Sequence, residues 1–298
     1  MIDNTNNLKY LNKKKTIYLL GGGNESPPIL FTNPHSGRNY YHYKNDIRND
    51  LKQLRKMEDT YIDILLNDLS NNGFKILATT TPTIFLDLNR DYREIDKNLF
   101  FNCDIQNIKE TRNLQSGYGL FFSKNHNQEP IYLKKLDWNL YRKKIDEEYC
   151  VFHNAIEEFF NCEKQKNSNC YLIDFHSMPS KLKGYVKPIP EICIGDNFGK
   201  SSTTDFREFI CNKFQQQGFT VAKNEPFSGG YITQNYGLPN HGSSSIQIEI
   251  RKDIYLNEDN LSLNKNFFEV KDKIYKICEE LRDYIELNNS SLNKKRIA

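Results

Sequence analysis

Short runs of apolar residues alternate along the chain with longer segments in which apolar positions recur at helical spacing. The short runs are rich in β-branched and aromatic residues, which is typical of β-strands. The predicted strands are 16–20, 29–33, 74–80, 84–88, 171–175, 192–195, 219–222 and 245–250. The predicted helices are 50–71, 138–160, 203–217 and 265–287. Strands and helices in alternation indicate an α/β protein built on a layered sheet.

The 298 residues show no internal repeat and no segment with the composition of a linker. We therefore expect one α/β domain over 16–287, preceded by a polar segment over 1–15 and followed by a flexible tail over 288–298. Residues 91–137 carry no clear hydrophobic period. We expect them to form an insertion or a long loop region over one end of the sheet, where such segments are often functional.

Composition narrows the classes of partner. The 41 basic and 38 acidic residues leave a formal net charge of only +3, which gives no strong attraction to nucleic acid or to a membrane. Seven scattered cysteines without a CxxC pair argue against a disulfide framework and against a cysteine zinc site. The polar N-terminus is unlike a signal peptide, and no apolar run is long enough to span a bilayer. We expect a cytoplasmic protein, and its oligomeric state stays open.

Polar residues, glycine or proline follow five of the apolar runs near their carboxyl ends. In open α/β sheets, ligands bind at the carboxyl ends of the strands. Five such endings favour a binding or catalytic site there over an accident of sequence. The five stretches are "ILFTNPHSGR", "IFLDLNRDYR", "YLIDFHSMPS", "ICIGDNFGKS" and "SSIQIEIRKD".

Two histidines from these endings, His35 and His176, are candidates for metal ligands. Two histidines and one carboxylate are a common donor set for catalytic zinc. The carboxylate could come from Glu58, Asp59 or Asp63, and the last two are four residues apart on one face of the predicted helix. Each acid could instead cap or pair on a helix surface, and His176 could belong to an ordinary hydrogen-bonded strand end.

Glu249 is a candidate for proton transfer. It lies on the face of its strand opposite three isoleucines, and an inward-facing acid is costly to bury without a role or a partner. An ion pair with Arg251, on the same face, is the alternative.

Arg90 is a candidate for substrate binding, because its planar guanidinium can donate two parallel hydrogen bonds to a substrate carboxylate. The alternative for Arg90 is a salt bridge to Asp87 or Asp91.

Two other stretches indicate what the site is not. The segment 226–237, "PFSGGYITQNYG", suits a loop whose backbone approaches a ligand closely, but it lacks the GK[ST] of a phosphate-binding loop. Ser36 and Ser177 each neighbour a histidine in sequence. Neither stands in a GxSxG elbow, so a serine hydrolase is a weak alternative.

Seven motifs, running in order from about residue 29 to 256, resemble those of the N-formylglutamate amidohydrolase (deformylase) family. The resemblance implies a mixed central sheet flanked by helices, similar to the zinc carboxypeptidases (phosphorylase/hydrolase-like), with 16–287 as the catalytic domain. It also implies one Zn²⁺ per chain, although another divalent metal is possible. The motifs are "NPHSGR", "EDTYID", "FLDLNR", "DFHSMPS", "IGDNFGKSS", "PFSGGYITQNYG" and "IQIEIRKDIY".

The family reaction converts N-formyl-L-glutamate and water to formate and L-glutamate, late in one route of histidine breakdown. Carried over by motif, the metal ligands would be His35, Asp59 and His176, with Glu58 as the fallback carboxylate. Glu249 would be the catalytic glutamate. The residues implied at the substrate are Arg90 for its carboxylate and, lining the pocket, Asn89, Gly230, Tyr231 and Thr233.

One departure from the family pattern concerns the substrate. Family members often carry a histidine shortly before the QxE strand, where this chain has Ser244, and His241 lies three residues upstream. Substrate identity therefore stays open. The alternatives are an amidase or peptidase acting on a larger acylated substrate, or a metal-binding homologue without catalysis.

Overall fold

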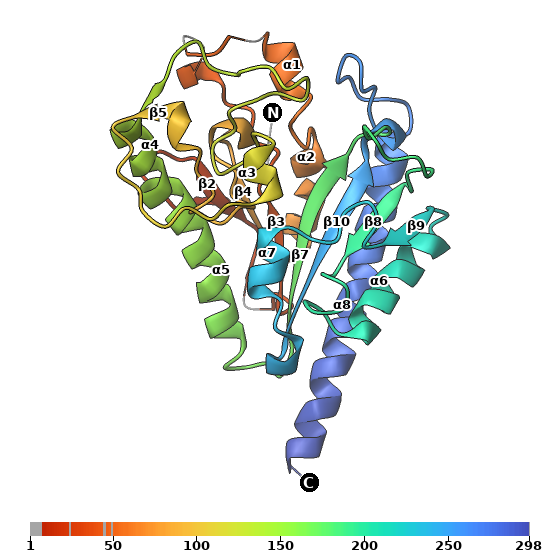
Figure 1. The fold of residues 1–298 in the computed structure, drawn as a ribbon. Helices are drawn as coiled ribbons and strands as arrows, with labels where there is room; N and C mark the ends of the chain where they lie inside the picture. Colours follow the sequence, from red (N-terminus) through yellow and green to blue (C-terminus); the bar gives the residue numbers. More distant parts are fainter. Residues whose placement is uncertain (1–7, 24, 44–45, 49, 298) are drawn as a thin grey trace.

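The computed structural model describes residues 8–23, 25–43, 46–48 and 50–297. An eight-stranded mixed sheet forms its centre, in the order β1-β2-β4-β3-β7-β10-β8-β9 (Figure 1). The strands are β1 (Leu8–Tyr10), β2 (Ile17–Leu20), β3 (Ile29–Asn33), β4 (Lys75–Thr79), β7 (Cys170–Met178), β8 (Ile192–Gly195), β9 (Val221–Lys223) and β10 (Ser243–Arg251). A separate two-stranded pair joins β5 (Phe100–Phe101) and β6 (Leu136–Asp137).

Strand direction decides which loops meet. The four neighbouring strands β4, β3, β7 and β10 run parallel, so their carboxyl ends lie at one edge of the sheet. The next strand, β8, is antiparallel to β10. The end of β8 at Gly195 therefore pairs with Gln247 inside β10 and does not reach the edge where β10 ends.

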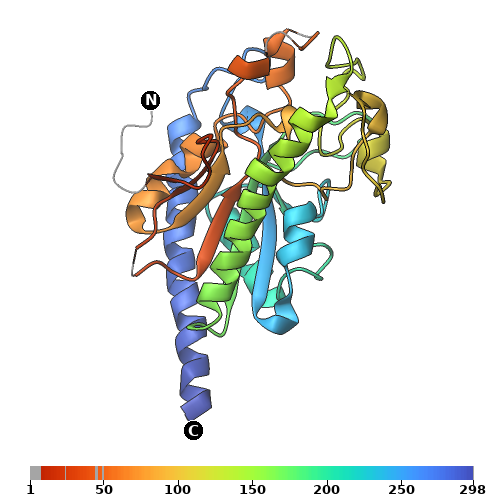
Figure 2. The same cartoon turned by 90° about the vertical axis from the view of Figure 1, so that its left-hand side faces the viewer.

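Helices cover both faces of the sheet (Figures 1 and 2). On one face, the isoleucines of β10 share a core with α2 (Ile62–Leu66), α6 (Thr204–Gln216) and α8 (Phe267–Ile297). On the other, Leu30 and Leu172 pack with α5 (Cys150–Glu163), α7 (Tyr231–Tyr236) and apolar side chains from 84–136. The α/β class with a mixed sheet flanked by helices is therefore confirmed. The remaining α-helices are α1 (Leu51–Arg55), α3 (Arg112–Gln115) and α4 (Trp138–Lys144).

Seven of the eight predicted strands are present, and the strand predicted at 84–88 is wrong. Thr83–Phe85 forms a 3₁₀ turn, Leu86 is extended, and 88–89 forms a further turn, so this stretch joins no strand ladder. Ile84, Phe85 and Leu88 are buried in the core on the α5 face of the sheet, together with apolar side chains from 91–137. A buried segment that pairs with no strand has the same run of apolar residues as a buried strand. The hydrophobic pattern therefore could not distinguish an unpaired segment from a strand. The short strand β1 lies within the segment that we expected to be only polar.

The helix predicted at 50–71 is interrupted. α1 ends at Arg55, α2 begins at Ile62, and 56–61 between them is irregular. Tyr61, the residue before α2, has a φ of 69°, a left-handed conformation that a continuous α-helix cannot contain. Asp59 and Asp63 therefore do not share a helix face, and this expectation is corrected. The second predicted helix continues from α4 through a π-helical turn, Ile145–Tyr149, into α5, and α8 runs beyond the predicted end at 287.

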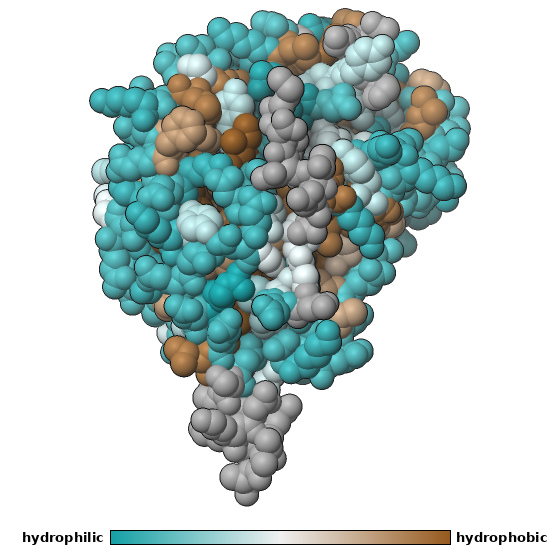
Figure 3. Space-filling model, turned by 180° about the vertical axis from the view of Figure 1, so that it is seen from behind, coloured by the Kyte–Doolittle hydropathy of each residue, from teal (hydrophilic) through white to brown (hydrophobic). Residues whose placement is uncertain are grey.

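The surface seen from behind is mostly hydrophilic, with scattered apolar residues (Figure 3). Among the helices of the described chain, none has the length and apolar character that crossing a membrane requires.

His153 on α5 is buried as a neutral imidazole. Its Nε2 lies 3.0 Å from the carbonyl of Leu88 and its Nδ1 lies 2.8 Å from the hydroxyl of Tyr236. The carbonyl can only accept, so Nε2 carries the proton and Nδ1 accepts from the tyrosine. Burial lowers the pKa of His153 to about 4, against a smaller opposite effect of the Leu88 carbonyl.

We expect His153 to make the fold sensitive to acid. In the unfolded chain His153 binds a proton below its usual pKa of 6.5, whereas in the folded chain it stays neutral down to about pH 4. Stability is therefore lost as the pH falls through this window, by up to roughly 3 kcal/mol. Urea unfolding of His153→Gln at pH 7 and pH 4.5 should show a smaller acid loss than the wild type. His241→Gln, at an exposed histidine, is the control and should follow the wild type; equal acid losses in all three proteins would contradict the assignment.

Candidate active site

Three parallel strands and two loops bring the candidate residues together at the carboxyl edge of the sheet. His35 follows β3 by two residues, and His176 and Glu249 are paired in register on β7 and β10. Asp59 arrives from the irregular segment 56–61, because the interruption of the predicted helix lets this stretch reach the sheet edge. Its backbone N–H donates to the His35 carbonyl at 3.0 Å.

The two histidines and Asp59 form a compact donor set. Asp59 Oδ2 lies 2.8 Å from His176 Nδ1 and 3.4 Å from His35 Nδ1. One ligand atom from each of the three residues lies within 4.8 Å of the others. Ser177 Oγ donates to Asp59 Oδ1 at 3.0 Å, which turns the other carboxylate oxygen toward the histidines. All three expected ligands are therefore brought together.

A carboxylate holds the far nitrogen of each histidine. His35 Nε2 lies 2.6 Å from Asp87 Oδ1, and His176 Nε2 lies 2.8 Å from Asp174 Oδ2. Thr32 Oγ1 donates to the other oxygen of Asp174 at 2.6 Å. Metal-binding histidines commonly donate their second N–H to a carboxylate in this way, because it fixes the ring and leaves the first nitrogen free to coordinate. The donor set therefore fits a zinc ion, or a similar divalent cation, by its chemistry.

The electrostatics of the donor set favour positive charge. Burial by itself lowers the pKa of His35, but Asp87 and Asp59 outweigh it and raise the pKa to about 9. The pKa of His176 is likewise raised well above its usual value, because Asp174 and Asp59 outweigh burial. Burial raises the pKa of Asp59, yet hydrogen bonds from both histidines hold it far below its usual range. A cation bound at this site would compete with protons for the histidine nitrogens.

Glu249 stands next to this donor set, and no lysine or arginine among the described residues forms an ion pair with it. Burial raises the pKa of its carboxyl to about 7, although the nearby histidines pull it down. Gln247 Nε2 donates to Glu249 Oε1 at 2.7 Å, and Gln247 Oε1 accepts from the Gly230 N–H at 2.6 Å. Arg251 pairs with Asp253 instead, at 2.6 Å. The alternative ion pair between Glu249 and Arg251 is therefore absent.

Arg90 reaches the same cavity and is held by the backbone. Its Nε donates to the Tyr118 carbonyl and one terminal nitrogen to the Asn89 carbonyl, each at 2.9 Å. The other terminal nitrogen lies 3.5 Å from Asp87. The salt bridge that we considered as the alternative is thus present with Asp87, and Arg90 also lines the cavity.

These residues enclose a cavity of about 380 Å³. Of the expected pocket residues, Asn89 and Gly230 line it, whereas Tyr231 and Thr233 do not. Asn89 also contacts the residues behind the donor set: its Nδ2 lies 3.2 Å from Asp174 Oδ2 and 3.1 Å from His176 Nε2. The full lining consists of His35, Asp59, Asn89, Arg90, Asn113, His176, Ser177, Pro226, Phe227, Ser228, Gly229, Gly230, Gln247 and Glu249.

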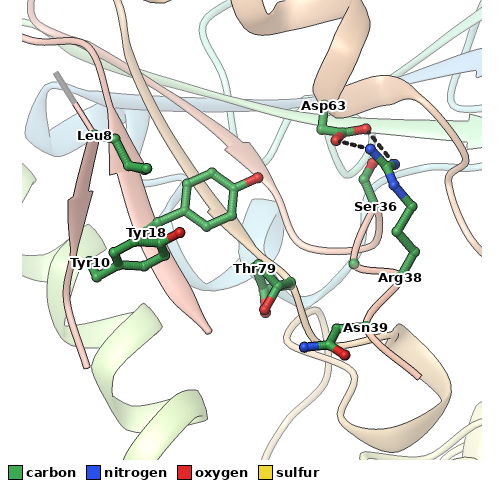
Figure 4. Close-up of a pocket in the computed structure, with 10 residues that line it drawn as sticks. Leu8, Tyr10, Tyr18, Ser36, Arg38, Asn39, Asp63 and Thr79 are labelled. Atoms are coloured by element: carbon green, nitrogen blue, oxygen red, sulfur yellow. Dashed lines mark hydrogen bonds and ion pairs between the residues drawn. The ribbon is translucent and has the colours of Figure 1, made fainter. Parts of the chain in front are cut away.

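The other two candidate acids point elsewhere. The Glu58 carboxylate lies 3.5 Å from Arg55, and burial raises its pKa to about 7. Asp63 forms a two-pronged ion pair with Arg38, at 2.7 and 3.0 Å, beside a separate cavity of about 290 Å³ near β1 and β2 (Figure 4). That cavity contains none of the three donors, so we place the reactive centre in the larger one.

Asn113 and Gln247 line the cavity without having been singled out as site residues. Asn113 comes from α3, in the segment 91–137. The sequence predicted that this segment would lie over the sheet, but nothing in its pattern indicated which of its side chains would reach the cavity. Gln247 alternates with Glu249 along β10, and this spacing could have identified it.

Of the five polar strand endings, the one after β8 does not line the cavity, which corrects that expectation. Asp196, after β8, pairs with Arg207 at 2.9 Å and lies outside the cavity, because β8 runs antiparallel to β10. Ser244 and His241 lie at the amino end of β10 and do not line the cavity either. The departure from the family pattern at Ser244 therefore lies outside the cavity lining.

Comparison with known proteins agrees with this architecture. The profile of the N-formylglutamate amidohydrolase family matches residues 27–256. The N-formylglutamate deformylase of Pseudomonas putida is 22% identical over 238 residues, which is 78% of this chain and 82% of that protein. The crystal structure of N-formylglutamate amidohydrolase from Ralstonia eutropha JMP134 superposes with a TM-score of 0.85 at 25% identity, covering 92% of this chain and 99% of that one. The Agrobacterium tumefaciens gene product Atu2144, 15% identical with a TM-score of 0.52 over 89% of this chain and 96% of that one, supports the fold alone.

The mixed sheet between helices, with a His–Asp–His donor set and a neighbouring glutamate at its carboxyl edge, defines an α/β protein with a candidate metal centre. Because the family profile covers more than half of its length, the chain belongs to the N-formylglutamate amidohydrolase family.

Proposed function

We propose that the chain is a metal-dependent amidohydrolase that cleaves N-formyl-L-glutamate with water to formate and L-glutamate. The observation that carries the proposal is the position of Glu249 in one cavity with the His35, Asp59 and His176 donor set. Its carboxylate is buried and has no ion-pair partner in the described part of the chain. The names of the Pseudomonas putida and Ralstonia eutropha proteins support the choice of substrate.

The donor set would hold one divalent cation, most simply Zn²⁺, through His35 Nδ1, His176 Nδ1 and Asp59 Oδ2. When bound, such a cation supplies Lewis-acid chemistry and makes a neighbouring water more acidic. Asp87 and Asp174 fix the orientation of the two imidazoles and accept the N–H of the far nitrogen, so that each Nδ1 would offer its lone pair to the cation.

Glu249 would act as general base and then as general acid. It takes a proton from the attacking water as the new C–O bond forms at the formyl carbon, and it returns that proton to the amine as the C–N bond breaks. Gln247 holds one oxygen of Glu249, which leaves the other oxygen for proton transfer in the cavity that Glu249 lines. A carboxyl pKa near neutrality suits a group that must both accept and donate a proton.

Arg90 would bind a carboxylate of the substrate. It is the only lysine or arginine among the residues that line the cavity, and its backbone hydrogen bonds hold the guanidinium in place before substrate arrives. The cavity of about 380 Å³ suits a small N-acyl amino acid better than a peptide. The place of this reaction in histidine breakdown stays a prediction from the family resemblance.

Arg90→Ala is expected to raise KM for N-formyl-L-glutamate by about 10–100-fold, because a hydrogen-bonded charge pair contributes about 1.5–3 kcal/mol. Arg90→Lys should recover only part of the loss, since lysine lacks the planar fork. Steady-state kinetics with zinc-saturated protein measure both. Arg93→Ala, which removes an arginine paired with Asp91 outside the cavity, is the matched control. An unchanged KM in Arg90→Ala would remove the assigned role.

The substrate is tested by formate release from a panel of N-formyl amino acids. We expect turnover of N-formyl-L-glutamate at an ordinary enzymatic rate, about 1–1,000 per second. N-acetyl-L-glutamate and an N-formylated tripeptide probe the acyl group and the space beyond the amino acid. Faster release from the tripeptide would favour the amidase or peptidase alternative. Zinc binding with no turnover of any member would favour the non-catalytic homologue.

A further inference from the structure

The segment that carries Asp59 is fixed by residues from the far end of the chain. It has no regular secondary structure. Its own backbone hydrogen bonds are short-range turns, in which Met57 N–H donates to the Leu54 carbonyl at 3.0 Å and Glu58 N–H to the Arg55 carbonyl at 3.2 Å. On the side of β3, the Asp59 N–H donates to the His35 carbonyl at 3.0 Å, and Ser36 Oγ donates to the Asp59 carbonyl at 2.7 Å. These two bonds fix the segment at a single residue only.

The flanking carbonyls are held from the other side, by the turn after β10. Lys252 Nζ donates to the Glu58 carbonyl at 2.6 Å and to the Lys56 carbonyl at 3.1 Å. Tyr255 OH donates to the Thr60 carbonyl at 2.9 Å. The carbonyls on both sides of Asp59 are thus bound to one short turn.

Lys252 is an unusual residue to find in this place. Its side chain is only 6% exposed, and no carboxylate among the described residues forms an ion pair with it. Burying an ammonium group with only neutral partners is costly, so a lysine that merely filled space there would be a poor choice. Tyr255 is fully buried beside it. The turn begins three residues after Glu249, which links the strand of the proposed base directly to the segment of the proposed ligand.

We propose that Lys252 and Tyr255 are positioning residues that set the affinity of the site for its metal. They hold the backbone on both sides of Asp59, so that its carboxylate is already placed opposite the two histidines. The inference rests on the proposed function in one respect, since it takes His35, Asp59 and His176 as the metal ligands. It does not depend on which amide the protein cleaves.

The test is zinc affinity, measured by competition with a chromophoric chelator. Lys252→Met and Tyr255→Phe are each expected to weaken zinc binding by about tenfold or more, since loss of support around metal ligands commonly costs 10–100-fold. Lys252→Arg should recover part of the affinity, because a guanidinium can still donate to carbonyls. Lys75→Met is the matched control: Lys75 pairs with Glu163 at 2.7 Å, at the amino end of β4. It should bind zinc as the wild type does.

The melting temperature of each metal-free variant separates positioning from general stability. If Lys252→Met and Tyr255→Phe melt lower but bind zinc within about twofold of the wild type, the proposal is overturned. Tyr255→Phe keeps the test decisive if Lys252→Met does not fold. The wild-type titration comes first: a wild type that binds zinc but releases no formate would overturn the proposed function alone, whereas one that binds no zinc would overturn both.

Discussion

Glu249→Gln is expected to lower kcat for N-formyl-L-glutamate by about 10²–10⁴-fold, the range that positioned acid–base groups contribute. Glutamine keeps the shape of the side chain and can still accept the 2.7 Å hydrogen bond from Gln247, but it cannot take a proton from water. Because Glu249 is not in the donor set, zinc affinity should remain within about tenfold of the wild type. Steady-state kinetics and a zinc titration on the same preparation separate the two effects.

The matched control is Glu258→Gln, which changes a glutamate that accepts hydrogen bonds from Ser180 at 2.7 and 2.8 Å and does not line the cavity. It should retain wild-type turnover. Near-wild-type kcat in Glu249→Gln would show that another group moves the proton, and the assignment of the base would have to be abandoned.

The second large effect is expected at Asp59. Asp59→Asn removes the negative charge from the oxygen that lies 2.8 Å from His176 and 3.4 Å from His35, so zinc affinity should fall by more than about 100-fold, with activity following it at limiting zinc. Glu58→Gln is a demanding control, because it makes the same chemical change one residue away. Its carboxylate faces Arg55 and not the histidines.

Zinc affinity in Glu58→Gln is therefore expected to stay close to that of the wild type. Chelator competition with both variants decides between the two carboxylates. If Glu58→Gln lost zinc and Asp59→Asn kept it, Glu58 would have to be the ligand and the irregular segment would have to rearrange on metal binding.

The ends of β7 and β10 could be predicted from sequence because strand alternation puts His176 and Glu249 on defined faces. The same reasoning placed His35 near them, since the parallel order of β3, β7 and β10 brings their carboxyl ends together. It failed at Asp196, whose strand is antiparallel, because local pattern carries no information on strand direction.

The path of the chain around Asp59 could not be predicted in the same way. An apolar stripe at helical spacing predicted an uninterrupted helix, whereas tertiary contacts from Ser36, Lys252 and Tyr255 hold the middle of it open. Those partners lie far away in the sequence. Asn113 is similar, because only the packing of 91–137 over the sheet brings it to the cavity.

The central claim is that one metal ion at His35, Asp59 and His176 enables hydrolysis of an N-formyl amino acid. The most direct measurement is a titration of zinc into chelator-treated, dialysed protein, with formate release from N-formyl-L-glutamate followed at each step. The account predicts negligible release at the start and a rise that ends near one zinc per chain. Full formate release from the metal-free protein, with no change as zinc is added, would contradict it.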